Sequence, residues 1–179
     1  MITTKHLFKG INNGQNIDFE IEKNAKWEKI YRNIYFDTTC NADIVLISSP
    51  YWTNVESSIY LNKIISFLGD EGYFLGFPHN LKSEDINNLL GGYSIPLVKK
   101  VMQSGRVTEN NISIIYLDGH NNPGFSGGPV LFFNRNSPSD KNLYLIGVIN
   151  GYISSNKENT GIIIAHSIKH IYNILDQIK

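Results

Sequence analysis

The stretch Pro123-Gly124-Phe125-Ser126-Gly127-Gly128-Pro129-Val130 places one serine among three glycines and two prolines. Glycine has no Cβ, so the backbone can adopt positive φ and other groups can approach closely. In such a loop the N–H groups of Gly124 and Ser126 can point the same way, beside the serine hydroxyl. A nucleophile next to two convergent N–H donors is what acyl transfer requires. A glycine-rich hairpin with an incidental serine would look the same locally, so the rest of the chain must decide.

The composition of the 179-residue chain is that of a globular protein, with 41% hydrophobic and 12% aromatic residues. This length suits one domain or two small ones with a sizeable core. The formal net charge is zero and the basic residues are spread along the chain, which argues against nucleic-acid binding. No apolar run reaches the roughly 18 residues of a membrane span. We therefore expect neither a nucleic-acid partner nor a membrane partner.

Cys40 is the only cysteine, so an intrachain disulfide cannot form. A single cysteine fits a reducing compartment, and the residues that follow Met1 contain no apolar segment typical of a signal peptide. Both observations favour a cytoplasmic location. A segment upstream of Met1 would remove the second argument and leave a secreted or periplasmic location open.

Short apolar stretches separated by turn signals predict an all-β barrel or sandwich. The expected strands are residues 2–4, 17–21, 34–36, 42–47, 73–78, 96–103, 112–117, 130–133, 143–150 and 161–165. Residues 51–66 fit neither helix nor strand clearly, and residues 82–90 are expected to form a surface excursion with a short helical period. The turn at residues 69–72 is the expected boundary between an N-terminal domain, residues 1–70, and a C-terminal domain, residues 71–179.

The end of the chain differs from the rest because its apolar residues recur at helical spacing. They are Ile168, Ile171, Ile174, Leu175 and Ile178. Ser167 stands where it could cap such a helix. The sequence therefore predicts an amphipathic C-terminal helix.

The segment Gly124–Gly128 also matches the G-x-S-x-G pattern of a hydrolase nucleophile elbow, which requires a helix after the serine. Here Pro129 and the apolar run 130–133 follow, and these predict a strand. His166 and His170 lie downstream, but at the end of a strand and on the terminal helix. The elbow interpretation is therefore disfavoured.

The other known arrangement of a serine nucleophile places histidine, aspartate and serine in that order on β-barrels. His6 follows a predicted strand, and Asp43 opens the apolar strand 42–47, where a buried acid needs a hydrogen-bonding partner. Asp18 and Asp37 are weaker candidates because neither opens an apolar strand. Taken singly, His6 could equally be a surface residue and Asp43 a turn residue.

Together these residues resemble the chymotrypsin-like (trypsin-like) serine peptidases, most closely the bacterial Htr/Deg-type and short trypsin-like-peptidase branch. Residues 118–130 are similar to that branch's D-x-x-x-N-P-G-N-S-G-G-P-L segment. Residues 2–6 look like its strand-T-x-x-H segment, and residues 43–46 like its D-x-A-V-L strand. Residues 76–78 resemble the G-x-P that opens the second barrel, and residues 145–150 and 161–165 resemble the strands that frame the specificity pocket.

The resemblance implies two antiparallel β-barrels of the six-stranded type, followed by the C-terminal helix, and a serine endopeptidase that acts on peptides or proteins without a cofactor or a metal. It implies Ser126 as nucleophile, His6 as general base and then acid, and Asp43 as the residue that orients His6. The N–H groups of Gly124 and Ser126 would form the oxyanion hole. In the family several strands precede the histidine, whereas five residues do here, so the first barrel is expected to be incomplete or to continue upstream.

The resemblance also implies a specificity pocket. His120, six residues before the serine, would lie at its base, with Ile149, Asn150 and Gly151 along one wall. No aspartate stands at the base, so a preference for lysine or arginine is not expected, and small or apolar residues are favoured instead.

Phe125 departs from the family, which has asparagine or aspartate at this position. No carboxylate is therefore present for activation by a new N-terminal amine, and activity would be controlled in another way. Two other functions stay open at this point. One is a catalytically impaired trypsin-fold module that binds a peptide or protein in the same groove, and the other is an esterase on a different fold.

Overall fold

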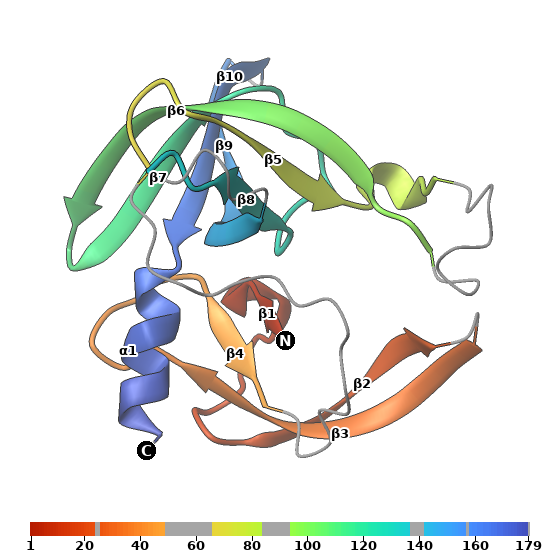
Figure 1. Ribbon diagram of the computed structural model, residues 1–179. Coiled ribbons are helices and arrows are strands. Elements are labelled where there is room, and N and C mark those ends of the chain that lie inside the picture. Colours follow the sequence, from red (N-terminus) through yellow and green to blue (C-terminus); the bar gives the residue numbers. More distant parts are fainter. Residues whose placement is uncertain (24–25, 49–65, 84–93, 137–141, 157, 179) are drawn as a thin grey trace.

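The computed structural model describes residues 1–23, 26–48, 66–83, 94–136, 142–156 and 158–178. Within these ranges the chain forms two antiparallel sheets, two short 3₁₀-helices and one C-terminal α-helix (Figure 1). The expected all-β class with a terminal helix is confirmed. In the described ranges, no helix has the length and apolar character needed to cross a membrane.

The first sheet contains four strands in the order β1-β4-β3-β2. They are β1 (Ile2–Thr3), β2 (Asn16–Lys23), β3 (Lys26–Phe36) and β4 (Val45–Ile47). Among its described side chains, Ile17, Ile34, Val45 and Ile47 form a buried hydrophobic cluster. The ambiguous stretch 51–66 lies almost entirely outside the described residues.

Strand β3 is much longer than the predicted strand 34–36. Its residues 26–33 pair with β2 in a hairpin whose side chains include the exposed Trp27 and Tyr31. An exposed strand has no buried face, so its sequence lacks the alternation of apolar and polar residues by which strands are recognised. The sequence pattern therefore predicts only the buried end of β3, residues 34–36.

The second sheet is a closed barrel with the strand order β10-β7-β6-β5-β8-β9. Its strands are β5 (Glu71–Gly76), β6 (Leu97–Glu109), β7 (Ile112–Asp118), β8 (Pro129–Phe133), β9 (Leu143–Ser155) and β10 (Glu158–Ser167). All six strands predicted for this part of the chain are found. The predicted excursion 82–90 falls mainly outside the described residues.

Strand β8 directly follows the serine loop, so the loop does not lead into a helix. This excludes the nucleophile elbow as the setting of Ser126. The barrel core lies beneath the loop and includes the fully buried Phe74, Phe125, Val130 and Ile149.

Helix α1 (Lys169–Gln177) follows the barrel but packs against β3 and β4 of the first sheet (Figure 1). Its buried Ile171 and Ile174 share a cluster with Ile44 from the first half of the chain and Leu145 from the barrel. The helix therefore joins the two sheets. The N-cap position falls on Ile168, one residue after Ser167, and Ile168 makes no side-chain capping hydrogen bond.

Ser167 still belongs to β10, where its hydroxyl accepts a hydrogen bond from the N–H of Lys169 at 3.3 Å. The serine singled out in the sequence thus does accept an N–H from the start of the helix, although it lies in the strand.

Candidate active site

The histidine and aspartate singled out in the sequence meet through the pairing of β1 with β4, in which Thr3 lies opposite Val45. His6 lies on a short 3₁₀-helix, Lys5–Leu7, directly after β1, and Asp43 lies just before β4. The His6 Nδ1 is 2.6 Å from Asp43 Oδ2, and the His6 backbone N–H donates to Asp43 Oδ1 at 2.7 Å. One carboxylate thus binds both the ring and the backbone of the histidine.

The segment that carries His6 is well anchored. The N–H of Ile47 donates to the carbonyl oxygen of Met1 at 2.8 Å, and Thr4 is fully buried. Thr3 also contacts the serine loop, because a Cβ added at Gly127 would meet its hydroxyl. The segment that leads to His6 is therefore held by the first sheet through Met1 and contacts the serine loop through Thr3.

Asn150 on β9 connects the aspartate to the serine. Its side-chain Nδ2 donates to Asp43 Oδ2, and its backbone carbonyl oxygen accepts the Ser126 hydroxyl at 2.8 Å. The serine hydroxyl is therefore bonded to Asn150 and not to the His6 ring. The sequence predicts Asn150 only as part of a pocket wall. Its contacts with both Asp43 and Ser126 arise because β9 packs against the serine loop and against the segment before β4.

Glycines give the serine loop its shape. Gly124 has φ +101° and Gly127 has φ +85°, and this region of backbone conformation is strained for residues with a Cβ. A Cβ at Gly124 would lie 2.5 Å from the carbonyl oxygen of Phe77. Within the described part of the chain, the N–H groups of Gly124 and Ser126 have no acceptor. Both donors are thus available to an oxygen atom of a ligand.

A buried aromatic ring and a lysine hold the loop from beneath. Phe125 is fully buried and packs edge-on against Phe74, with ring centroids 4.7 Å apart. The ammonium of Lys99, on β6, donates to the carbonyl oxygen of His120 and to Asn122 Oδ1, each at 2.7 Å, and lies 5.2 Å from the Phe125 ring centroid. Burial lowers the pKa of Lys99.

Replacing Lys99 with methionine is expected to lower the free energy of unfolding by about 1–3 kcal/mol, because two charge-assisted hydrogen bonds are lost while the aliphatic packing is kept. Urea titration measures the change. Lys100→Met is the matched control, since Lys100 is exposed and forms an ion pair with the exposed Glu71. Equal effects of the two substitutions would contradict the role given to Lys99.

The residues predicted for a specificity pocket lie at different depths. His120 is exposed, and Ile149 is fully buried in the barrel core. The carbonyl oxygen of Gly151 accepts a hydrogen bond from Asn121 Nδ2 at 3.2 Å. Asn121 is 4% exposed, and its Oδ1 has no hydrogen-bond partner among the described residues. Sequence reasoning missed Asn121, because one asparagine in a polar loop carries no signal of burial.

An open cleft of about 320 Å³ lies beside the histidine and aspartate. His6 and Asp43 form part of its lining, and the other lining residues are Lys5, Phe8, Lys9, Gly10, Ile11 and Asn41. The cleft therefore gives a ligand access to the His6 side chain, which is 44% exposed.

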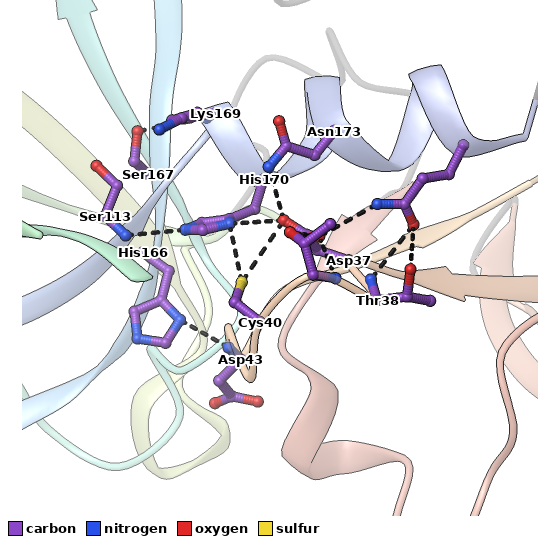
Figure 2. A network of polar contacts seen from close by, with 12 residues as sticks. Asp37, Thr38, Cys40, Asp43, Ser113, His166, Ser167, Lys169, His170 and Asn173 are labelled. Carbon is purple, nitrogen blue, oxygen red and sulfur yellow. Dashed lines mark hydrogen bonds and ion pairs between the residues drawn. The ribbon is translucent and has the colours of Figure 1, made fainter. Parts of the chain in front are cut away.

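One group of side chains has the residue types of a metal site. The ligand atoms of Asp37, Cys40 and His170 lie within 4.8 Å of one another (Figure 2). However, His170 Nε2 accepts the backbone N–H of Ser113 at 3.0 Å, so the ring proton is on Nδ1 and faces Asp37 Oδ2 at 3.0 Å. Burial also raises the pKa of the Cys40 thiol. The group is therefore satisfied as a hydrogen-bond network, and we assign no metal to it.

Comparison with protein-family models and with curated proteins gives no match. Among solved structures, a variant of the HtrA-type protease AlgW with a tripeptide superposes with a TM-score of 0.63 at 17% identity, over 99% of this chain and 51% of that one. The chain has the trypsin-like serine protease fold. This confirms the fold that the sequence resemblance implied.

Two further structures with this fold match over 99% of the chain. One is Rv3671c from M. tuberculosis H37Rv in an inactive form, with a TM-score of 0.54, 14% identity and 75% of that chain covered. The other is a mutant of human heparin binding protein, with a TM-score of 0.57, 12% identity and 80% covered. The chain spans about half the length of the AlgW structure.

Proposed function

We propose that the chain is a serine endopeptidase that hydrolyses peptide bonds through an acyl-enzyme on Ser126, with His6 and Asp43 completing a catalytic triad. The observation that carries the proposal is the placement of Asn150, which binds the Asp43 carboxylate with its side chain and the Ser126 hydroxyl with its backbone. The acid, its histidine and the serine thus share one small region on a fold that serine proteases use.

The histidine has the tautomer that the reaction needs. His6 Nδ1 faces a carboxylate oxygen, so it carries the ring proton and leaves the Nε2 lone pair to act as a base. Rotation of Ser126 about χ1 turns its hydroxyl away from the Asn150 carbonyl and towards Nε2. Such rotation between staggered rotamers is a small change of the side chain, and it exchanges the hydrogen bond to Asn150 for one to His6.

Each proton and bond in the proposed cycle has a place. Ser126 Oγ attacks the substrate carbonyl carbon while its proton passes to His6 Nε2. The carbonyl oxygen becomes an oxyanion and accepts hydrogen bonds from the N–H groups of Gly124 and Ser126. His6 then gives its proton to the leaving amine as the peptide bond breaks. In the second half of the cycle a water molecule attacks the acyl carbon while its proton passes to His6 Nε2. His6 then returns the proton to Ser126 Oγ as the ester bond breaks, which releases the carboxylic acid product and restores Ser126.

Support for a substrate class comes from the cleft that His6 and Asp43 help to line, although Ser126 is not among its lining residues. The open cleft beside His6 can take a chain segment, and the related AlgW structures contain peptides. We infer that the substrate is a peptide or protein. None of His120, Ile149, Asn150 or Gly151 carries a carboxylate, so we propose cleavage after small or apolar residues and not after lysine or arginine.

A fluorophosphonate probe tests the proposal, because it forms a covalent bond with an activated serine. Wild-type protein is expected to gain one probe, mapped to Ser126 by peptide mass spectrometry. Ser126→Ala should abolish the reaction, whereas Ser104→Ala, at an exposed serine on β6, should leave it unchanged. If folded wild-type protein does not react with the probe, the proposal of a serine endopeptidase is overturned. A module that binds peptides without cleaving them would then be favoured.

A further inference from the structure

The backbone of Asp43 depends on a histidine from the far end of the chain. The N–H of Asp43 donates to His166 Nδ1 at 2.7 Å, as Figure 2 shows. His166 lies at the end of β10, is 7% exposed, and pairs with Ile114 of β7 and Val148 of β9. Because its strand is hydrogen-bonded on both sides within the closed barrel, His166 is a fixed acceptor.

The direction of the hydrogen bond from Asp43 determines which nitrogen of the His166 ring carries a proton. A backbone N–H can only donate, so His166 Nδ1 must be unprotonated, and the neutral ring carries its proton on Nε2. Burial lowers the pKa of His166, and His170 acts in the same direction, whereas the Asp43 carboxylate opposes them. Burial therefore favours the neutral ring that the contact requires.

A second histidine holds the other end of the same connection. His170, four residues further on in helix α1, contacts Asp37 at 3.0 Å and accepts the N–H of Ser113. Asp37 begins the segment between β3 and β4, residues 37–44, and Asp43 lies one residue before its end. The two histidines thus fix both ends of this segment to the barrel and to α1 (Figure 2).

We propose that His166 is a positioning residue for the reaction: it accepts the Asp43 N–H and thereby sets where the carboxylate meets His6. The inference rests on the proposed function. The carboxylate is held by three donors, namely the His6 ring, the His6 N–H and Asn150 Nδ2, and His166 fixes the backbone from the opposite side. Small displacements of groups that orient a catalytic base cost large factors in rate.

Two substitutions of His166 distinguish the loss of its hydrogen-bond acceptor from the loss of its side-chain packing. His166→Leu keeps much of the volume but removes the acceptor, and is expected to lower kcat by roughly 10–100-fold with little change in KM. His166→Asn can present its Oδ1 near the position of Nδ1 and is expected to recover most of that loss. Ile115→Val, a core change on β7, controls for lost stability and should leave kcat unchanged at a temperature where all variants are folded.

Hydrogen exchange of the Asp43 amide supplies a readout that does not depend on activity. Exchange should be faster in His166→Leu than in wild type and should slow again in His166→Asn. Equal kcat and equal exchange in the leucine variant would overturn the inference, as would an asparagine variant no better than leucine. Failure of the proposed function is distinguishable, because wild-type protein would then neither react with the fluorophosphonate nor hydrolyse peptides.

Discussion

Replacing Asp43 with asparagine is expected to lower kcat for peptide hydrolysis by about 10⁴-fold while the protein stays folded. In the wild type, Asp43 Oδ2 accepts from the His6 ring and from Asn150, and Oδ1 accepts from the His6 backbone. Asparagine has one carbonyl oxygen for these two positions. If its amide nitrogen faces the ring, it stabilises the tautomer with the proton on Nε2, which cannot accept the proton of Ser126.

The measurement is steady-state hydrolysis of a peptide ester or amide, with circular dichroism to confirm the fold of each variant. Asp18→Asn is the matched control, because Asp18 is an exposed residue on β2 that pairs with Lys29. The control should keep wild-type activity. An Asp43→Asn variant within tenfold of wild type would show that Asp43 does not orient the base.

The parts of the molecule that the sequence predicts well are those in which neighbouring residues determine the structure. The six barrel strands have a buried face and therefore a readable pattern, and the order of His6, Asp43 and Ser126 follows from short motifs. The contact between His6 and Asp43 could be expected because the resemblance implies Asp43 as the residue that orients His6. That contact is present in the structure.

Contacts between distant segments could not be predicted in this way. From the sequence, His166 and His170 are candidates only for the histidine of a nucleophile elbow, and Asp37 is only a weak candidate for the acid of a triad. A lone histidine or aspartate has the same local sequence whether it lies at the surface or in a buried network. Only the packing of α1 onto the first sheet brings Asp37 and His170 together. Lys99 was missed for the same reason, since its partners lie more than 20 residues away.

Replacing Asp37 with asparagine is expected to lower the free energy of unfolding by about 3–5 kcal/mol at pH 7. Asp37 is 1% exposed, and its carboxylate accepts hydrogen bonds from several donors. They are the Thr39 N–H and hydroxyl, the His170 ring, Asn173 Nδ2 and Gln177 Nε2. In asparagine, an NH₂ group replaces one of the two carboxylate oxygens that accept these hydrogen bonds. This NH₂ group faces other donors, so the buried donors on that side lose their acceptor.

The free energy of unfolding lost in the Asp37→Asn variant should also depend on pH. Burial alone would raise the pKa of Asp37, but hydrogen bonds from Thr39, His170 and Asn173 outweigh it and hold the pKa well below its usual range. A depressed folded-state pKa means that the stabilisation is complete above the unfolded value of about 4 and is lost as pH falls below it. The difference between wild type and Asp37→Asn should therefore be constant from pH 7 to pH 5 and shrink towards pH 3.

Urea unfolding at pH 7, 5 and 3 measures this dependence, with Asp18→Asn as a control at an exposed acid. The control should change stability far less at every pH. Because the same network anchors the segment that carries Asp43, Asp37→Asn should also slow the reaction of Ser126 with the fluorophosphonate under conditions where the variant is folded. A variant that is as stable as wild type at pH 7 would mean that this network does not hold α1 on the first sheet.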